Sequence, residues 1–152
     1  MSLKVSYYRN VLLETHRGNG HGIISNAKPY LLLTIIKLIE DGEIIGNRIQ
    51  FDNRKLSEIY NSIAKFYEPQ KEVTPLPKPF FHLNREPFYY LKWKAETNIP
   101  KQATTPSAKF LRENVEYACL DEELWELLQD PETRNEFRDA IIRHFINPSR
   151  SV

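Results

Sequence analysis

The sequence predicts an α+β fold, with one helix-dominated domain and a small antiparallel sheet of three strands. A winged-helix-like arrangement is one form that this fold could take. Segments 27–40 and 52–67 carry apolar residues at helical spacing, while segments 87–94 and 115–120 have the composition of strands. Helices and strands alternate irregularly, which favours antiparallel pairing. A chain of 152 residues is long enough for one domain, over 1–152, with a well-buried core.

The first half of the chain is predicted to be mostly helical. A helix is expected over 2–15, and the three glycines of segment 16–25 predict a loop directly after this helix. The next helix, over 27–40, begins after a capping Asn or Ser and has a proline in its first turn. Its apolar residues cover nearly the whole circumference, so we expect it to be the central buried helix. Segment 43–51 then predicts a short hairpin or one strand, and Asp52 is the expected N-cap of the helix after it.

Shorter elements are expected in the second half. Four prolines in segment 68–79 predict an extended connection. An apolar side on the last helix predicts that this helix docks on the core. The other expected elements are a strand over 87–94, a short helix capped by Thr105-Pro106 that runs to about Asn114, a strand over 115–120, and helices that start at Asp121 and at Asp130-Pro131.

Cysteine content and hydropathy indicate the compartment. Cys119 is the only cysteine, so the chain can form no internal disulfide, which favours a reducing environment. No apolar run approaches the roughly 20 residues that span a bilayer, and the N-terminus lacks the pattern of an export signal. We therefore expect a cytoplasmic protein with no membrane partner.

Charge is distributed unevenly along the chain. Residues 113–139 contain ten acidic and two basic residues, a net charge of −8, whereas residues 1–112 carry a net charge of +7. A basic part beside an acidic part can present a cationic face to phosphates while the total charge stays at +1. The alternative, that these charges only solvate helix faces, stays open at this point.

Catalytic motifs do not occur in the sequence. No two histidines have the i, i+4 spacing that places two metal ligands on one helix face. The chain also lacks an acid-x-Lys pair, a Gly-x-Ser-x-Gly motif and a phosphate-binding Gly-Lys-Ser loop. We therefore expect no enzymatic activity from this chain, no metal site and no cofactor.

Two stretches combine basic residues with features that bind anions. The helix that starts in "SNAKPYLLL" would direct free backbone N–H groups at the preceding loop, where Arg17 and His21 join Lys28. The alternative is that Lys28 merely solvates the helix start. In the second stretch, "LPKPFFHLNREPFYYLKW", the aromatic residues suit a core, but Lys78, His82 and Arg85 do not.

Within the second stretch, Pro79 with Phe80 and Phe81 could be a core anchor only. Lys78 and His82 stand on either side of this anchor, where they could flank an exposed apolar pocket. The sequence thus predicts phosphate-binding residues at Arg17, His21, Lys28, Lys78 and Arg85.

The segments "NAKPYLLLTIIKLIEDGEI", "PKPFFHLNREPFYYLKW" and "EYACLDEELWELLQDPETRNEFRDAIIRHF" occur in an order that resembles a known family. It is the N-terminal sulfur-recognising DNA-binding domain of HNH-type and McrA-like type IV restriction endonucleases. The resemblance covers roughly residues 20–146. It implies binding of phosphorothioate-modified DNA, in which an apolar cavity takes the sulfur that replaces one phosphate oxygen.

The resemblance also implies which residues form this cavity. Ala27-Lys28-Pro29 matches the family's His-basic-Pro, and the run from Lys78 to His82 matches its Tyr-Pro-Phe-Trp-Ala. The implied sulfur pocket consists of Lys78, Pro79 and His82. Three departures, at Ala27, Lys78 and His82, are expected to make the cavity more polar and tighter than in the family.

From the residues and the resemblance together, we expect a non-catalytic module that binds double-stranded DNA and belongs to a restriction system. Relatives of full length append an HNH nuclease, and no such segment follows Val152, so we expect either an isolated domain or a stand-alone reader, with the nuclease as a further domain or a separate subunit. The alternative is a protein-interaction or regulatory domain that binds a partner through its acidic C-terminal helices.

Overall fold

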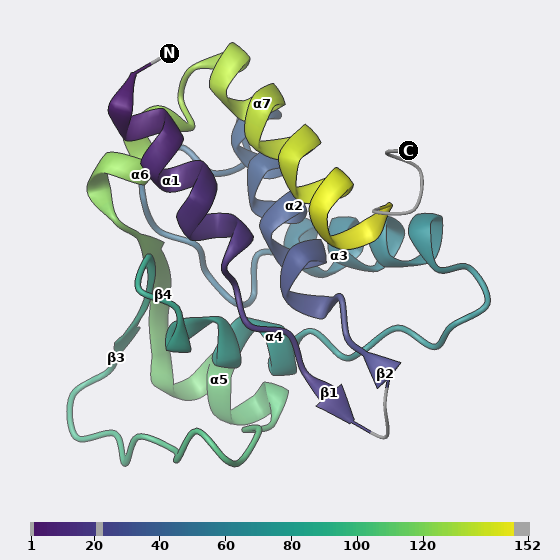
Figure 1. Cartoon of the computed structure of the whole chain (residues 1–152). Helices are drawn as coiled ribbons and strands as arrows, with labels where there is room; N and C mark the ends of the chain where they lie inside the picture. The colour runs from purple at the N-terminus through teal and green to yellow at the C-terminus, as the bar shows by residue number, and fades with distance from the viewer. Residues whose placement is uncertain (1, 21–22, 148–152) are drawn as a thin grey trace.

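A computed structural model of the chain describes residues 2–20 and 23–147 (Figure 1). It confirms the predicted helix-dominated α+β fold with a small antiparallel sheet. Strands β1 (Asn19–Gly20) and β2 (Ile23–Ile24) form one antiparallel pair, and β3 (Tyr89–Trp93) and β4 (Val115–Leu120) form another. The helices are α1 (Leu3–Leu13), α2 (Ala27–Glu40), α3 (Arg54–Tyr67), α4 (Pro77–His82), α5 (Ala108–Asn114), α6 (Glu122–Leu127) and α7 (Pro131–Ile141), with a 3₁₀ turn η1 (Leu83–Arg85) and a π-helical turn η2 (Ile142–Ile146).

Helix α2 is the centre of the core, as its pattern predicts. Leu31 and Leu38 are completely buried, and α3, α4 and α7 all contact this helix. Figure 1 shows α7 lying along both α1 and α2. The chain leaves α2 through Gly42, whose φ of +74° is one that residues with a Cβ rarely adopt. Buried residues of α1, the first element, and of η2, the last one, belong to the same apolar cluster as α2, so both ends of the described chain pack on one core.

Segment 43–51 does not form the predicted hairpin or strand. Only Ile49 pairs with β4, through an isolated antiparallel bridge to Ala118 with two hydrogen bonds of 2.7 Å. The side chain of Asn47 explains why pairing stops there, because it donates to the carbonyl of Leu120 and accepts from its amide. A third strand would have needed those backbone groups for its ladder. Within the part of the chain that is described, each sheet therefore has two strands rather than the expected three.

The extended connection predicted for 68–79 ends early, because α4 begins at Pro77. Pro77 and Pro79 both lie in the first turn of this helix, where a missing N–H breaks no helical hydrogen bond. Phe80 and Phe81 are fully buried, which confirms that they anchor the core. The hydroxyl of Tyr89 on β3 donates to the carbonyl of Phe80 at 2.7 Å and fixes α4 against the sheet.

Two predicted N-caps are wrong by one or two residues. The cap of α3 is Asn53 rather than Asp52, and its side chain accepts from the amide two positions later at 2.9 Å. The cap of α5 is Ser107 rather than Thr105, and it accepts from the amide three positions later at 3.1 Å. In both cases a short polar side chain farther along the sequence satisfies the free amides of the first turn.

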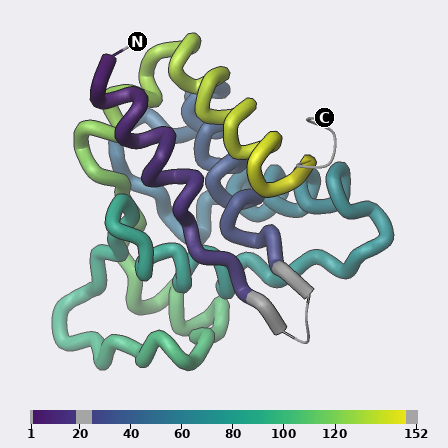
Figure 2. The backbone as a smooth tube through the Cα atoms, viewed as in Figure 1, coloured from purple at the N-terminus to yellow at the C-terminus, as the bar shows by residue number. Residues whose placement is uncertain are grey.

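Segment 16–25, predicted to be a loop, contains the antiparallel pair β1–β2, and the other elements agree with the predictions. The expected strands pair as β3 and β4, with Tyr89 opposite Leu120 and a bulge between Lys92 and Trp93. Figure 2 traces the long loop over 94–107 that leads from β3 to α5. Within the described residues, no helix has both the length and the apolarity needed to cross a membrane.

Candidate functional site

A hollow of about 210 Å³ lies between the start of α2 and the α4–η1 segment. The base of the β1–β2 hairpin forms its third side, where the amide of Ser25 donates to the carbonyl of Gly18 at 2.7 Å. The two basic stretches of the sequence meet here, although about 50 residues separate them along the chain. Its lining residues are His16, Arg17, Gly18, Ser25, Ala27, Lys28, Lys78, Pro79, His82 and Arg85.

Six of the seven residues predicted to form the site line this one hollow. The seventh, His21, lies outside the described residues. The basic residues that were expected around Pro79 thus line the same hollow as Pro79. What these side chains contact differs from one residue to the next, and the differences decide what the hollow can bind.

Lys28 lies in the first turn of α2 and is largely buried, with 12% of its side chain exposed. Its ammonium donates to Oε2 of Glu86 at 3.2 Å. Burial lowers the pKa of Lys28, and the charge of Arg85 adds to this effect, while Glu86 opposes it. Lys28 is therefore held within the protein as half of an ion pair.

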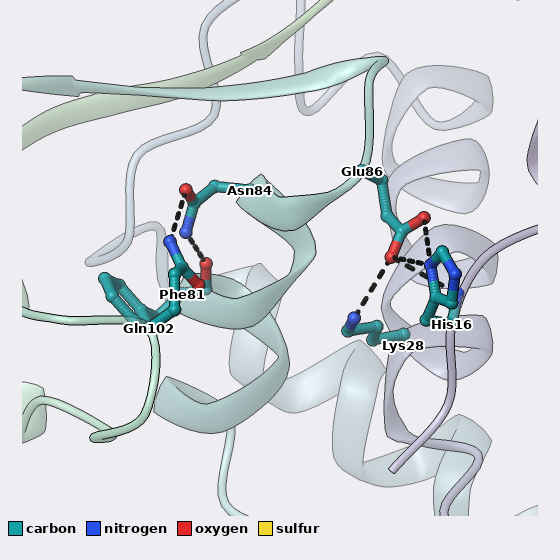
Figure 3. A network of polar contacts seen from close by, with 6 residues as sticks. All are labelled: His16, Lys28, Phe81, Asn84, Glu86 and Gln102. Atoms are coloured by element: carbon teal, nitrogen blue, oxygen red, sulfur yellow. Dashed lines mark hydrogen bonds and ion pairs between the residues drawn. The ribbon is translucent and has the colours of Figure 1, made fainter.

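Glu86 is the site residue that sequence reasoning missed. Only 2% of its side chain is exposed, and Figure 3 shows it placed between Lys28 and His16. Besides Lys28, its Oε2 accepts from the backbone amide of His16 at 3.2 Å, and both carboxylate oxygens lie 3.4 Å from His16 Nδ1. A signal was present in the sequence, because Glu86 is the one acidic residue within 76–93. It ties the segment after α1 to the start of α2 and to η1.

Arg17 is held by the far end of the chain. Its Nη1 donates to Asn26 Oδ1 at 2.9 Å and to the carbonyl of Phe145 at 3.3 Å. Its guanidinium also lies 4.9 Å from the centre of the Phe145 ring. Arg17 therefore brings a fixed positive charge to the hollow, with part of its donor capacity already used.

Lys78 and Arg85 are the free cations of the hollow. Both side chains are exposed, and in the described part of the chain neither forms an ion pair or a hydrogen bond. Lys78 is in the first turn of α4 and Arg85 is in η1, so they flank Pro79 and His82 along the chain. An anion entering the hollow would meet these two charges without having to displace an internal partner.

Pro79 and His82 supply the carbon surface of the hollow, together with Ala27. Pro79 is buried, and the imidazole of His82 packs edge-on against Phe81, with ring centres 4.9 Å apart. Nε2 of His82 lies 2.9 Å from the hydroxyl of Thr105 in the long loop. Burial lowers the pKa of His82, as do the nearby charges of Lys28, Lys78 and Arg85, so the surroundings favour the neutral ring.

The long loop is attached to the site at a second point. Gln102 donates to Asn84 Oδ1 at 2.9 Å, and Asn84 in turn donates to the carbonyl of Phe81 (Figure 3). Residues 102–105 are therefore tied to the α4–η1 segment next to the hollow. No pattern in the sequence indicated these contacts.

The arrangement suits binding of an anion that also has an apolar part. Two free cations stand beside a surface of Pro79, Ala27 and the His82 ring. Among residues 2–20 and 23–147, no three His, Cys, Asp or Glu side chains gather as ligands for a metal ion. The chemistry that these residues offer is charge neutralisation and apolar contact.

Comparisons with known proteins were made with the whole sequence. A scan against models of protein families finds no match, and a search of curated proteins finds none either. The case for a function therefore depends on the residues of the hollow and on their geometry.

Proposed function

We propose that this protein is a DNA-binding module that recognises phosphorothioate-modified DNA, has no catalytic activity of its own and serves a restriction-type system. The observation that carries this proposal is the 210 Å³ hollow, in which basic side chains from two distant stretches surround the carbon surface of Pro79. The order of motifs that resembles the sulfur-recognising domains supports the same function.

The physical chemistry of the ligand fits such a hollow. A phosphorothioate diester carries one negative charge and exposes a sulfur atom that is larger and more weakly hydrated than oxygen. Carbon atoms of Pro79 and Ala27 can contact this sulfur with little desolvation cost. Lys78 and Arg85 would hold the charged oxygen through charge-assisted hydrogen bonds.

Cleavage would come from elsewhere in this proposal. A nuclease domain of the HNH type, or a separate nuclease subunit, would act after the module has bound modified DNA. The module itself contributes recognition only.

Matched DNA duplexes test the proposal directly. Binding is measured with three duplexes of one sequence that carry no modification, one phosphorothioate or a methylated cytosine. We expect the tightest binding to the phosphorothioate duplex and a log K that falls linearly with log salt. Equal binding of all three would remove sulfur recognition, and salt-independent or absent DNA binding would favour the protein-interaction alternative.

A pair of variants locates the binding site on the protein. Lys78→Ala removes a free cation of the hollow, whereas Lys65→Ala removes an exposed lysine of α3 that does not line it. If DNA binds in the hollow, only the first variant weakens binding. Equal effects of the two variants would place the DNA elsewhere.

A further inference from the structure

A second basic hollow lies apart from the first, where the loop before α3 meets the junction of α5 and β4. Its volume is about 430 Å³, and three cationic side chains line it, those of Arg48, Lys94 and Arg112. The two hollows share no residue. The first hollow is lined by residues of α2, α4, η1 and the base of the β1–β2 hairpin, and the second by residues of the loop before α3, the position after β3, α5 and β4.

The three cations of this second hollow are exposed and unpaired. Within the described ranges, none of their side chains forms an ion pair or a hydrogen bond with another residue. Other basic residues that are partly exposed, such as Arg138 and Lys37, are paired with acids on neighbouring turns or helices. Three unpaired cations that converge on one concave surface leave their charge available to a ligand.

Arg48 is held in place without using its hydrogen-bond donors. Its guanidinium lies 4.9 Å from the centre of the Tyr117 ring on β4. Arg17 makes a similar contact with Phe145, but its Nη1 donates to two protein oxygens. Stacking on an aromatic ring restricts the guanidinium plane, and a guanidinium so placed binds phosphate oxygens through two parallel hydrogen bonds.

Two acidic residues, Asp52 and Glu116, line the same hollow. Both are exposed, and neither forms an ion pair with the cations in the described chain. They reduce the net charge of the hollow to +1 and oppose the binding of any anion, whereas the three cations, spread over about 430 Å³, can contact several phosphate groups at once. Removing one of these acids should therefore tighten binding, which a purely structural role would not do.

We propose that this second hollow is a phosphate-binding site, with Arg48 as its anchored ligand and Arg112 and Lys94 as its further cations. It takes chains of phosphate groups, as in the phosphodiester backbone of nucleic acid or in inorganic polyphosphate. The site goes beyond the sulfur-recognising hollow and does not depend on it.

Two ligands, three variants of the hollow and one control variant test this site. Fluorescence anisotropy measures binding of a labelled, unmodified DNA duplex, and calorimetry measures binding of inorganic triphosphate. Arg48→Ala should weaken binding of duplex roughly five-fold at low salt and reduce the slope of log K on log salt by about 0.9. Glu116→Gln should strengthen binding of duplex by a similar factor. Lys65→Ala, on α3 away from both hollows, should leave the affinities for duplex and for triphosphate unchanged.

Comparing the two ligands shows whether the site binds nucleic acid or phosphate chains in general. Loss of duplex binding with unchanged triphosphate binding assigns the site to nucleic acid, and loss of both assigns it to phosphate chains in general. If Arg48→Ala, Arg112→Ala and Glu116→Gln all bind both ligands as the wild type does, the proposal is wrong. This failure is separate from that of the first hollow, because Lys78→Ala tests the first hollow alone.

Discussion

Replacing Lys28 with methionine should destabilise the protein far more than removing any exposed cation of the first hollow. Glu86, with 2% of its side chain exposed, would lose the ammonium that lies 3.2 Å from its Oε2. Breaking a buried ion pair by removing one partner costs about 3–5 kcal/mol, because the other charge stays buried without compensation. Since part of the Lys28 side chain is still hydrated, we expect the lower end, about 3 kcal/mol.

Urea denaturation measures this loss as a lower midpoint at an unchanged slope. Lys78→Met is the matched control, and it should change the free energy of unfolding by less than about 0.5 kcal/mol. The double variant Lys28→Met/Glu86→Gln removes both charges and should recover much of the lost stability. A single variant as stable as the control, or a double variant no more stable than the single one, would refute the assignment of Lys28 and Glu86 as a buried pair.

Further predictions concern the ligand and pH. Lys78→Ala should weaken DNA binding and lower the slope of log K on log salt by about 0.9, with Lys65→Ala as the control, and an unchanged slope would exclude Lys78 from the phosphate site. Because the pKa of His82 is lowered on folding, the folded state binds fewer protons than the unfolded state as pH falls below about 6.5. Stability should therefore decrease in this range, and His82→Asn should flatten the dependence in thermal melts; a steeper dependence would contradict the lowered pKa. Pro79→Ala should reduce the preference for phosphorothioate over unmodified DNA by roughly five-fold, for a loss of about 1 kcal/mol of apolar contact. His82→Ala should increase that preference if the ring occupies the space for sulfur, whereas equal binding of both DNAs by both variants would end the case for a sulfur pocket.

The elements that the sequence predicts correctly are those with a strong local pattern. The apolar circumference of α2 and the composition of β3 and β4 depend on neighbours in the chain, so they could be identified without tertiary information. Segment 43–51 has a similar local pattern, but the side chain of Asn47 occupies the backbone groups of Leu120 that a strand would need. That competition is a contact over 73 positions, which no local pattern reveals.

Six residues of the candidate site could be predicted from the sequence, but its electrostatics, which depend on Glu86, could not. Basic residues next to a helix start and next to Pro79 indicated which stretches would form it. Which cations are free depends on Glu86, which pairs with Lys28 from 58 positions away. The sequence alone therefore treats Lys28 and Lys78 as equivalent, although one is buried in an ion pair and the other is exposed.

The contact between Arg17 and Phe145 sets the order in which the hollow can be completed. These residues are 128 positions apart, so the guanidinium finds this partner only after residue 145 has left the ribosome. Contacts of such long range form late, because loop closure must come first. A nascent chain released before residue 145 would have the basic residues of the hollow and the contact of Arg17 with Asn26, but not the contacts of Arg17 with Phe145. The full set of contacts that hold Arg17 would then form together with the docking of α7 and η2.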